Sequence, residues 1–215
     1  MRDEKRPYDA RRRRERAEEE RTATRRKVVE AARKLFLEQG YVATTMSAIA
    51  REAGVAMQSV YSAGKSKADL LHLVVDLAVA GDHDDVMLVD RPEVAAMATE
   101  PSARRQVEIL AERISATLTR LAPVWVASRE AAAVDANAAA NLEAAHRRRH
   151  ETFAHMIRHI REASLRESWA ETTDTAWAIG SIDVFLLLQS RGWDAARYSA
   201  WIQDVLVTQL LAPGH

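Results

Sequence analysis

The chain has 215 residues, with 31 acidic and 31 basic side chains, 7 glycines, 5 prolines and no cysteine. This length allows one or two domains with a sizeable buried core. The absence of cysteine excludes disulfides, thiolate metal sites and a cysteine nucleophile. No apolar run reaches the roughly 18 residues of a membrane span, and the charged N-terminus does not resemble a signal peptide, so we expect a soluble, cytoplasmic protein.

The neutral net charge hides an uneven distribution of charges along the chain. Residues 1–81 carry 17 Lys and Arg against 12 Asp and Glu, whereas residues 82–215 carry 14 against 19. A basic front half and an acidic back half suit a head that binds a polyanion and a body kept away from it. Chance clustering would give the same division, and the basic excess comes entirely from residues 1–27.

Residues 1–21 form a basic arm that has almost no large apolar side chain and includes Arg11–Arg14. Such a segment buries too little surface to offset its ordering entropy, which predicts a mobile arm or a frayed, solvated helix. The arginines can lie along DNA phosphates or enter a minor groove. Equally, glutamates at helical pairing distance, such as Glu15 and Glu18, can make the segment a solvated helical tail.

Residues 22–81 predict a small helical domain, in which Thr45 and Ser66 are placed to cap helices, and Gly40 and Gly54 to end them. Apolar positions at helical spacing predict helices at about residues 24–40, 46–53, 57–62 and 66–77. The middle two, joined by a tight glycine turn, have the layout of a helix-turn-helix that reads DNA. The alternative is a plain helical hairpin whose polar residues face water.

The start of the third predicted helix faces outward and carries the candidate base-reading residues. Gln58 can pair with an adenine edge, and Ser59 with a base edge or a phosphate. Ala56 or Met57 can meet a thymine methyl group. Four further residues suit phosphates, which position a protein without reading the sequence: Thr45, Tyr61, Lys65 and Lys67.

The same region carries a specific pattern over residues 24–77: Phe36, Gly40, Tyr41, Thr44, Thr45, Ile49, Ala50, Ala53, Gly54, Val55, Val60, Tyr61, Ser66, Lys67, Leu70 and Leu71. In this pattern the segment resembles the head of the TetR family of transcriptional repressors. The resemblance implies a homodimer on a palindromic, double-stranded DNA operator, with the third helix in the major groove. It also implies a separate body with an effector pocket and the dimer interface.

Carried over residue by residue, the resemblance implies DNA contacts from Thr44, Thr45, Gln58, Ser59, Tyr61 and Lys67. The chain departs from the family at Ser62–Gly64, where a His or Tyr and two aromatic residues are usual. This departure removes bulk behind the third helix and puts DNA affinity or operator preference in question.

Residues 82–215 predict a helical body. A connecting region at 81–102 with one short helical turn precedes helices at about 103–121, 124–134, 138–163, 173–190 and 195–211. Pro123, Asn137, Glu171–Thr172 and Gly192 separate these helices. The predicted fold is therefore all-α, with an N-terminal three-helix helix-turn-helix domain and a C-terminal helical bundle for effector binding and dimerisation.

Four histidines of one predicted helix raise the question of a metal site: His146, His150, His155 and His159. At about 100° per residue, His155 lies half a circle from His146, and His159 half a circle from His150. Glu143 and His146 form a Glu-x-x-His pair, but the second pair that a di-iron bundle needs does not exist. We therefore predict no metal and no cofactor.

An apolar stripe on that helix includes the polar residues His146 and Arg149. Polar groups on a buried stripe need partners, and in a regulator the partner can be an unidentified small-molecule effector with acceptor or anionic character. The alternative is internal pairing with a glutamate or a backbone carbonyl. The candidate effector pocket consists of Trp125, His146, Arg149, Phe153, Met156 and Trp177, although aromatic residues at helical spacing can also be plain core.

Residues 176–188 are apolar on almost every side, and the last predicted helix also has a broad apolar surface. A helix that is apolar all round is buried on more than one side. Two such helices that pair with their symmetry mates would form a four-helix dimer interface. Its candidate residues are Ile182, Phe185, Leu186, Trp201, Ile202, Val205 and Leu206, and a monomer with a thick core is the alternative.

The first functional hypothesis is a repressor that a small molecule releases from its operator. An all-α enzyme has little support, because the sequence has no nucleophile elbow, phosphate-binding glycine loop or paired metal motif. The third hypothesis is a helical interaction or RNA-binding module that works through the arginine arm. Its binding would not depend on Gln58 or Ser59.

Overall fold

The computed structural model describes residues 7–83 and 91–214. Within these ranges the chain is α-helical apart from turns, one 3-10 turn and an isolated bridge between Leu165 and Leu211. This confirms the predicted all-α fold. The chain divides into two compact units, Met1–Val74 and Val75–His215, and the division falls inside a helix rather than at residue 81. None of the helices in the described ranges has the length and apolar character needed to cross a membrane.

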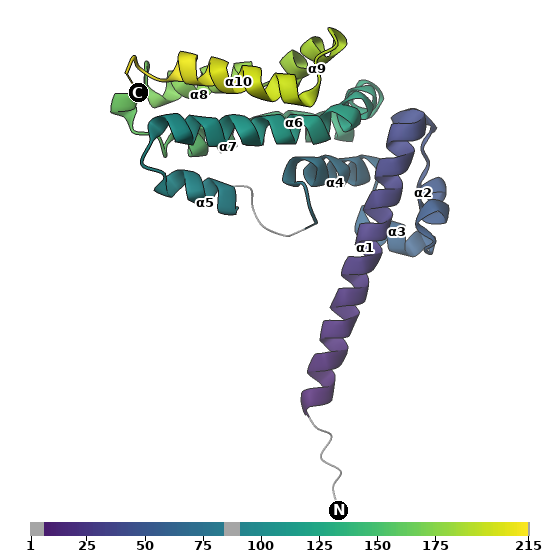
Figure 1. Cartoon of the computed structure of the whole chain (residues 1–215). Coiled ribbons are helices and arrows are strands. Elements are labelled where there is room, and N and C mark those ends of the chain that lie inside the picture. Colours follow the sequence, from purple (N-terminus) through teal and green to yellow (C-terminus); the bar gives the residue numbers. More distant parts are fainter. Residues whose placement is uncertain (1–6, 84–90, 215) are drawn as a thin grey trace, which may run out of the picture. The chain divides into compact units, whose positions relative to one another are not determined.

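The first unit contains the predicted helix-turn-helix. It consists of α1 (Pro7–Ala43), α2 (Met46–Ala53), α3 (Met57–Ala63) and the first part of α4 (Lys67–Ala80). Helices α2 and α3 pack against each other and against α1 (Figure 1). Fully buried side chains from all four helices form its core: Val28, Ala32, Ile49, Val60 and Leu70.

The ends of these helices follow the capping pattern of the sequence. Thr45 Oγ1 accepts a hydrogen bond from Ala48 N at 3.1 Å, at the start of α2. Ser66 Oγ accepts from Asp69 N at 3.1 Å, at the start of α4. Gly54 closes α2 with a φ of 66°, a left-handed conformation that favours glycine. The predicted caps of the second and fourth helices are thus confirmed.

Helix α1 begins much earlier than the expected start at residue 24. Its N-terminal part extends beyond α2 and α3 (Figure 1), and most of its side chains are exposed. Arg11 pairs with Glu15 at 2.8 Å and Arg21 with Glu18 at 3.5 Å, so residues 11–21 of the arm form a solvated helix. Residues 1–6 of the predicted arm lie outside the described residues.

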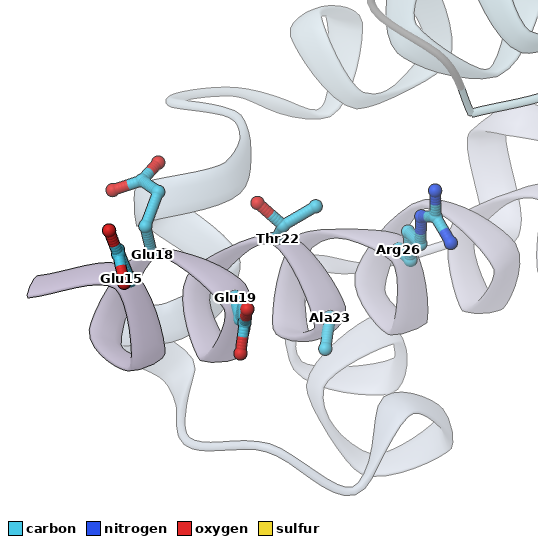
Figure 2. Close-up of a pocket in the computed structure, with 6 residues that line it drawn as sticks. All are labelled: Glu15, Glu18, Glu19, Thr22, Ala23 and Arg26. Carbon is cyan, nitrogen blue, oxygen red and sulfur yellow. The ribbon is translucent and has the colours of Figure 1, made fainter. Parts of the chain in front are cut away.

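A shallow hollow along this part of α1 is drawn in Figure 2. The residues that line it are Glu15, Glu18, Glu19, Thr22, Ala23 and Arg26. All of them come from α1, and all six are exposed. The hollow is therefore the open side of a single helix, and we assign no binding site to it.

The second unit is a bundle built around one long helix. Its elements after α4 are α5 (Pro92–Thr99), α6 (Ala103–Val134), α7 (Ala136–Ile157), a 3-10 turn (Glu162–Ser164), α8 (Trp169–Ile179), α9 (Ile182–Ser190) and α10 (Ala195–Leu210). Helix α6 packs against α5, α7, α9 and α10, and α8 packs against α7 and α10. Side chains of α6 and α10 such as Val107, Leu110, Ile202 and Leu206 are almost fully buried between these helices.

The predicted break at Pro123 is wrong, because α6 runs unbroken from Ala103 to Val134. The proline is exposed, whereas Val124 and Trp125 beside it are buried. Proline lacks an N–H and crowds the preceding turn, which disfavours a helix locally. Packing of the buried face outweighs this local preference.

The single helix expected at 173–190 is also wrong. The chain breaks at Gly180, and Ser181 Oγ then caps α9 by accepting from Val184 N at 3.3 Å. Helix α8 begins earlier than expected, in a capping box formed by Ser168 and Glu171. Glu171 therefore lies in the first turn of α8 rather than between helices.

Other helix boundaries also differ from the predicted ones. Asp135 caps α7 by accepting from Asn137 N at 2.9 Å, so Asn137 belongs to the helix and does not separate it from α6. The same helix ends at Ile157 rather than at residue 163. Pro92 is the first residue of α5. Proline suits this position because the N–H of a first-turn residue has no partner within the helix.

Candidate nucleic-acid interface and effector site

Helix α3 is anchored from one side and open on the other. Val60 is fully buried and holds α3 against the head. Gln58 is exposed, Met57 and Tyr61 are 37% and 51% exposed, and Ser59 is half-buried. The structure therefore presents the side chains that the sequence assigned to base edges together on the open side of one short helix.

Helix α2 directly precedes α3 in the chain, and the residues at its start present polar groups to solvent. Thr45 is exposed, and its hydroxyl lies 3.1 Å from the hydroxyl of Ser47, which is also exposed. Ser47 was not among the predicted site residues, although it follows a predicted cap by only two positions. Lys65, in the turn before α4, is exposed as expected for a phosphate contact.

Thr44 and Lys67 have internal roles instead of the predicted DNA contacts. Thr44 is fully buried, and its hydroxyl donates to Gly40 O at 2.8 Å. Lys67 Nζ donates to Tyr41 O at 2.7 Å and to Thr44 O at 2.9 Å, and it lies 4.1 Å from the centre of the Tyr41 ring. The last carbonyls of a helix need donors, and these two side chains supply them where α1 ends.

The departure at Ser62–Gly64 has a structural counterpart. A Cβ atom built on Gly64 would lie 2.6 Å from Leu70 Cδ2 and 3.2 Å from Leu70 N. Since Leu70 is fully buried, the end of α3 packs against α4 too closely for any side chain at position 64. The missing aromatic bulk is thus replaced by direct contact between the two elements.

Five of the six candidate effector residues meet on one side of α7. The Trp125 and His146 rings contact edge to face, with centroids 5.5 Å apart. The guanidinium of Arg149 lies 4.8 Å from the centre of the Phe153 ring and 5.2 Å from that of Trp177. Met156, the sixth, is buried further along the same helix.

Arg149 has the backbone partners that the sequence analysis kept as its alternative. Its Nη2 donates to Trp177 O at 2.5 Å and to Gly180 O at 2.8 Å, at the C-terminal end of α8. Burial lowers the pKa of Arg149 to about 10, so the side chain remains charged at neutral pH. Arg149 therefore joins α7 to the end of α8 as a half-buried cation.

Tyr198 is a neighbour of this group that the sequence analysis missed. It is 1% exposed, and its ring contacts Phe185 with centroids 4.8 Å apart. Burial raises the pKa of Tyr198, and the charge of Arg149 opposes that rise. Tyr198 lies on α10, far from α7 in sequence, so helical periodicity gave no signal for it.

The remaining histidines, His150 and His155 of α7 and His159 just after its end, do not form a ligand set. His150 Nε2 lies 2.8 Å from Asp174 Oδ1, and the His155 and His159 rings contact each other with centroids 5.0 Å apart. Burial, together with His155, lowers the pKa of His159. In residues 7–83 and 91–214 no group of three or more acidic, histidine or cysteine side chains is arranged to hold a metal ion.

Four of the seven predicted dimer residues face the core of their own chain. Ile182, Phe185, Ile202 and Leu206 are each 5% exposed or less, so their side chains already pack inside the single chain. The stripe that they form covers α6, which needs both α9 and α10 to bury its apolar face. The other three predicted residues, Leu186, Trp201 and Val205, are half-buried, and their neighbour Leu187 is 66% exposed.

A compact helix-turn-helix head followed by a larger helical bundle defines a class of DNA-binding transcription regulators. Residues 28–74 match the model of the family described as bacterial regulatory proteins, tetR family. The N-terminal unit is therefore similar to this family over the segment in which the sequence pattern predicted the resemblance. No match was found among curated proteins.

Solved structures with this fold extend the similarity over both units. A proposed transcriptional regulator from Saccharomonospora viridis in complex with choline is 22% identical, with 87% of this chain and 97% of that chain covered and a TM-score of 0.63. A SmeT–triclosan complex is 19% identical over 89% and 93%, with a TM-score of 0.65. NalD, the secondary repressor of the MexAB-OprM multidrug efflux pump in Pseudomonas aeruginosa, is 17% identical over 89% and 98%, with a TM-score of 0.63. At these identities the likeness shows the fold.

Proposed function

We propose that this chain is a repressor that binds a palindromic operator as a homodimer and leaves it when a small molecule binds the C-terminal unit. The observation that carries the proposal is the exposed face of α3, where Gln58, Met57 and Tyr61 project from a helix whose other side is buried. A short helix held in this way can enter a major groove with its side chains toward base edges. We assign no catalytic activity to the protein.

The proposed DNA contacts fall into two classes. Gln58, Ser59, Ala56 and Met57 read base edges, and the phosphate contacts come from Thr45, Tyr61 and Lys65. Thr44 and Lys67 are left out because their polar groups are engaged within the head.

A two-fold operator requires two copies of α3, which is the support for a homodimer. The surface that remains for a second copy consists of half-buried and exposed apolar side chains of α9 and α10: Leu186, Leu187, Trp201 and Val205. These side chains lie beside the buried stripe of Ile182, Phe185, Ile202 and Leu206 on the same helices. A dimer would cover the apolar surface that they form.

For a ligand to release the DNA, its binding to the C-terminal unit must move α4, the helix that continues into the head. Helix α4 continues without a break from Lys67 to Ala80. Its last turn is held by α6, because Arg120 Nε donates to Ala78 O at 2.9 Å and Arg120 Nη2 donates to Val79 O at 3.2 Å. Its Asp76 lies 3.8 Å from Arg148 of α7. A ligand that binds more tightly when α6 or α7 takes another position would favour that conformation. Because α4 is attached to both helices, α4 would then shift with them.

Selection of bound fragments from random duplex DNA tests the proposal, and a palindrome is the expected result. Gel shifts on the selected site should show binding reduced about tenfold or more by Gln58→Ala, since a bidentate base contact contributes roughly 1–3 kcal/mol. Ser62→Ala is the matched control, because Ser62 lies on the same helix and its hydroxyl donates to Gln58 O at 2.8 Å.

Equal binding by the Gln58→Ala variant and wild type would contradict the proposal. If binding in that experiment depends on the arm of residues 1–21 and is equally good on RNA, the protein is instead an arginine-arm binding module. Recovery of single half-sites without a palindrome would contradict the homodimer.

A further inference from the structure

Three buried donors in the body have no hydrogen-bond partner among the described residues. They are Trp125 Nε1, Trp177 Nε1 and Tyr198 Oη. Trp125 and Tyr198 are 7% and 1% exposed as whole residues, so water does not reach their polar atoms in this arrangement. An indole N–H can only donate, and a phenol can donate. Since buried polar groups are normally paired, three unpaired donors in one region require an explanation.

Arg149 of α7 is the half-buried cation of this region. Its guanidinium lies 5.2 Å from the centre of the Trp177 ring, and its charge acts on Tyr198. Trp125 contacts His146, which precedes Arg149 by three residues on the same face of α7. These side chains come from α6, α7, α8 and α10, which pack against one another. We call Trp125, Arg149, Trp177 and Tyr198 the donor cluster.

The charge of Arg149 is only partly compensated. Its Nη2 donates to two backbone carbonyls, but no carboxylate within the described parts of the chain lies at ion-pairing distance from its guanidinium. Asp183, which is exposed, acts on Arg149 only from a greater distance. A buried charge is usually paired with an opposite charge, so the cluster has a surplus of positive charge as well as of donors.

The position of Arg149 also determines which ligands the aromatic rings can accept. Its guanidinium lies over the Phe153 and Trp177 rings, at 4.8 Å and 5.2 Å from their centres. These ring faces therefore already hold a cation. A second cation in the cluster would meet like-charge repulsion, whereas an anionic oxygen would find several donors and a positive charge.

We propose that the donor cluster binds the carboxylate, or a similar anionic oxygen, of a small amphipathic molecule whose apolar part lies against Phe153 and Phe185. This inference rests on the proposed ligand-released repressor and adds the chemical class of its effector. The anion accepts from the indole and phenol groups that lack partners and completes the pairing of Arg149. It also contacts the residue that holds the end of α8, so its binding reaches the junction of α8 and α9.

Three probes that differ in one terminal group test the sign of the charge: phenylbutanoate, phenylbutanol and phenylbutylamine. Each is titrated into the full-length protein, and its affinity is measured by calorimetry at neutral pH. We expect phenylbutanoate to bind at least about tenfold more tightly than phenylbutanol, since charge-assisted hydrogen bonds are about twice as strong as neutral ones. The amine should bind more weakly than the alcohol.

Tyr198→Phe removes the phenol oxygen and leaves the ring in place. It should weaken phenylbutanoate binding about fivefold to tenfold but leave the Tm of the free protein unchanged, because the hydroxyl has no partner to lose. Trp169→Phe is the matched control, since Trp169 Nε1 donates to Ile160 O at 2.9 Å outside the cluster. That control should lower the Tm and leave the affinity for phenylbutanoate unchanged.

Several results would overturn the inference. They are no binding of phenylbutanoate at millimolar concentration, equal or tighter binding of the amine, and unchanged phenylbutanoate affinity in Tyr198→Phe. A loss of Tm in Tyr198→Phe as large as that in Trp169→Phe would also overturn it, because the hydroxyl would then have a structural partner.

The proposed function is tested separately by adding the probes to the complex with the selected DNA. If phenylbutanoate binds through Tyr198 but does not release DNA, the ligand class stands and ligand release fails. If another molecule releases the DNA while phenylbutanoate does not bind, the repressor stands and the ligand class fails.

Discussion

At the residue scale, the head is held together by side chains that pair with the free backbone groups at helix ends. Thr45 and Ser66 were identified as caps because a cap depends only on the next three residues. Thr44 and Lys67 were assigned to DNA, yet both satisfy carbonyls at the end of α1. Lys67 is 26 residues from Tyr41, and no local pattern reveals such a partner.

Gly64 offers a direct test of the packing behind α3. In Gly64→Ala the new methyl group overlaps the buried Leu70 side chain, because the Cβ would lie 2.6 Å from Leu70 Cδ2. We expect the free energy of unfolding to fall by about 1–3 kcal/mol, as is usual for overpacking. Denaturant unfolding measures it, with Ser62→Ala as the exposed control, which should stay within about 0.5 kcal/mol. A neutral Gly64→Ala would mean that α3 and α4 can separate at no cost.

At the scale of elements, the periodicity of the long helices was predicted well from the sequence, and their number poorly. Pro123 was interpreted as a break and lies inside α6, while Gly180 was not interpreted as one and divides α8 from α9. Both errors have one cause. A breaker shifts the local preference by a few kcal/mol at most, and the surface buried by the surrounding helices decides whether the helix continues.

The internal proline of α6 leads to a prediction of increased stability. Pro123→Ala restores an N–H that can donate to Thr119 O and removes the ring that crowds the preceding turn. Because Pro123 is exposed, we expect the free energy of unfolding to rise by about 1–3 kcal/mol. Thermal or denaturant unfolding measures the change. Ala116→Gly, at another exposed position of α6, should lower stability by about 1 kcal/mol. A less stable Pro123→Ala protein would show that the packing of the buried Val124 and Trp125 depends on the proline.

At the scale of the whole molecule, the helical arm is the largest feature without a packed partner among the described elements. Its arginines are matched by glutamates of the same helix, as in the pair of Arg11 with Glu15. Such exposed pairs are weak, so they do not by themselves prevent contact with phosphates. The arm continues α1, and the salt dependence of DNA binding measures whether it contacts phosphates.

We expect deletion of residues 1–21 to leave the salt dependence of operator binding unchanged to within about one unit of slope. Each phosphate contact that is lost would lower the slope by about 0.9, so a fall of about three units would place the arginine run on DNA. Gel shifts over a range of salt concentrations give the slope. A full-length variant with glutamine at each position of Arg11–Arg14 separates the effect of charge from that of length.

The sequence by itself determined the features that depend on neighbours within a turn or two. These are the all-α class, the caps of the head, the outward face of α3 and the pattern that residues 28–74 share with the tetR family model. Only the tertiary structure decided which apolar faces belong to the core, so Ile202 and Leu206 moved from a predicted dimer surface to the interior. It also brought Arg149 of α7 to the carbonyls of Trp177 and Gly180 at the end of α8. The physical reason is range: capping and periodicity act over a few residues, whereas burial and charge pairing depend on which distant helices meet.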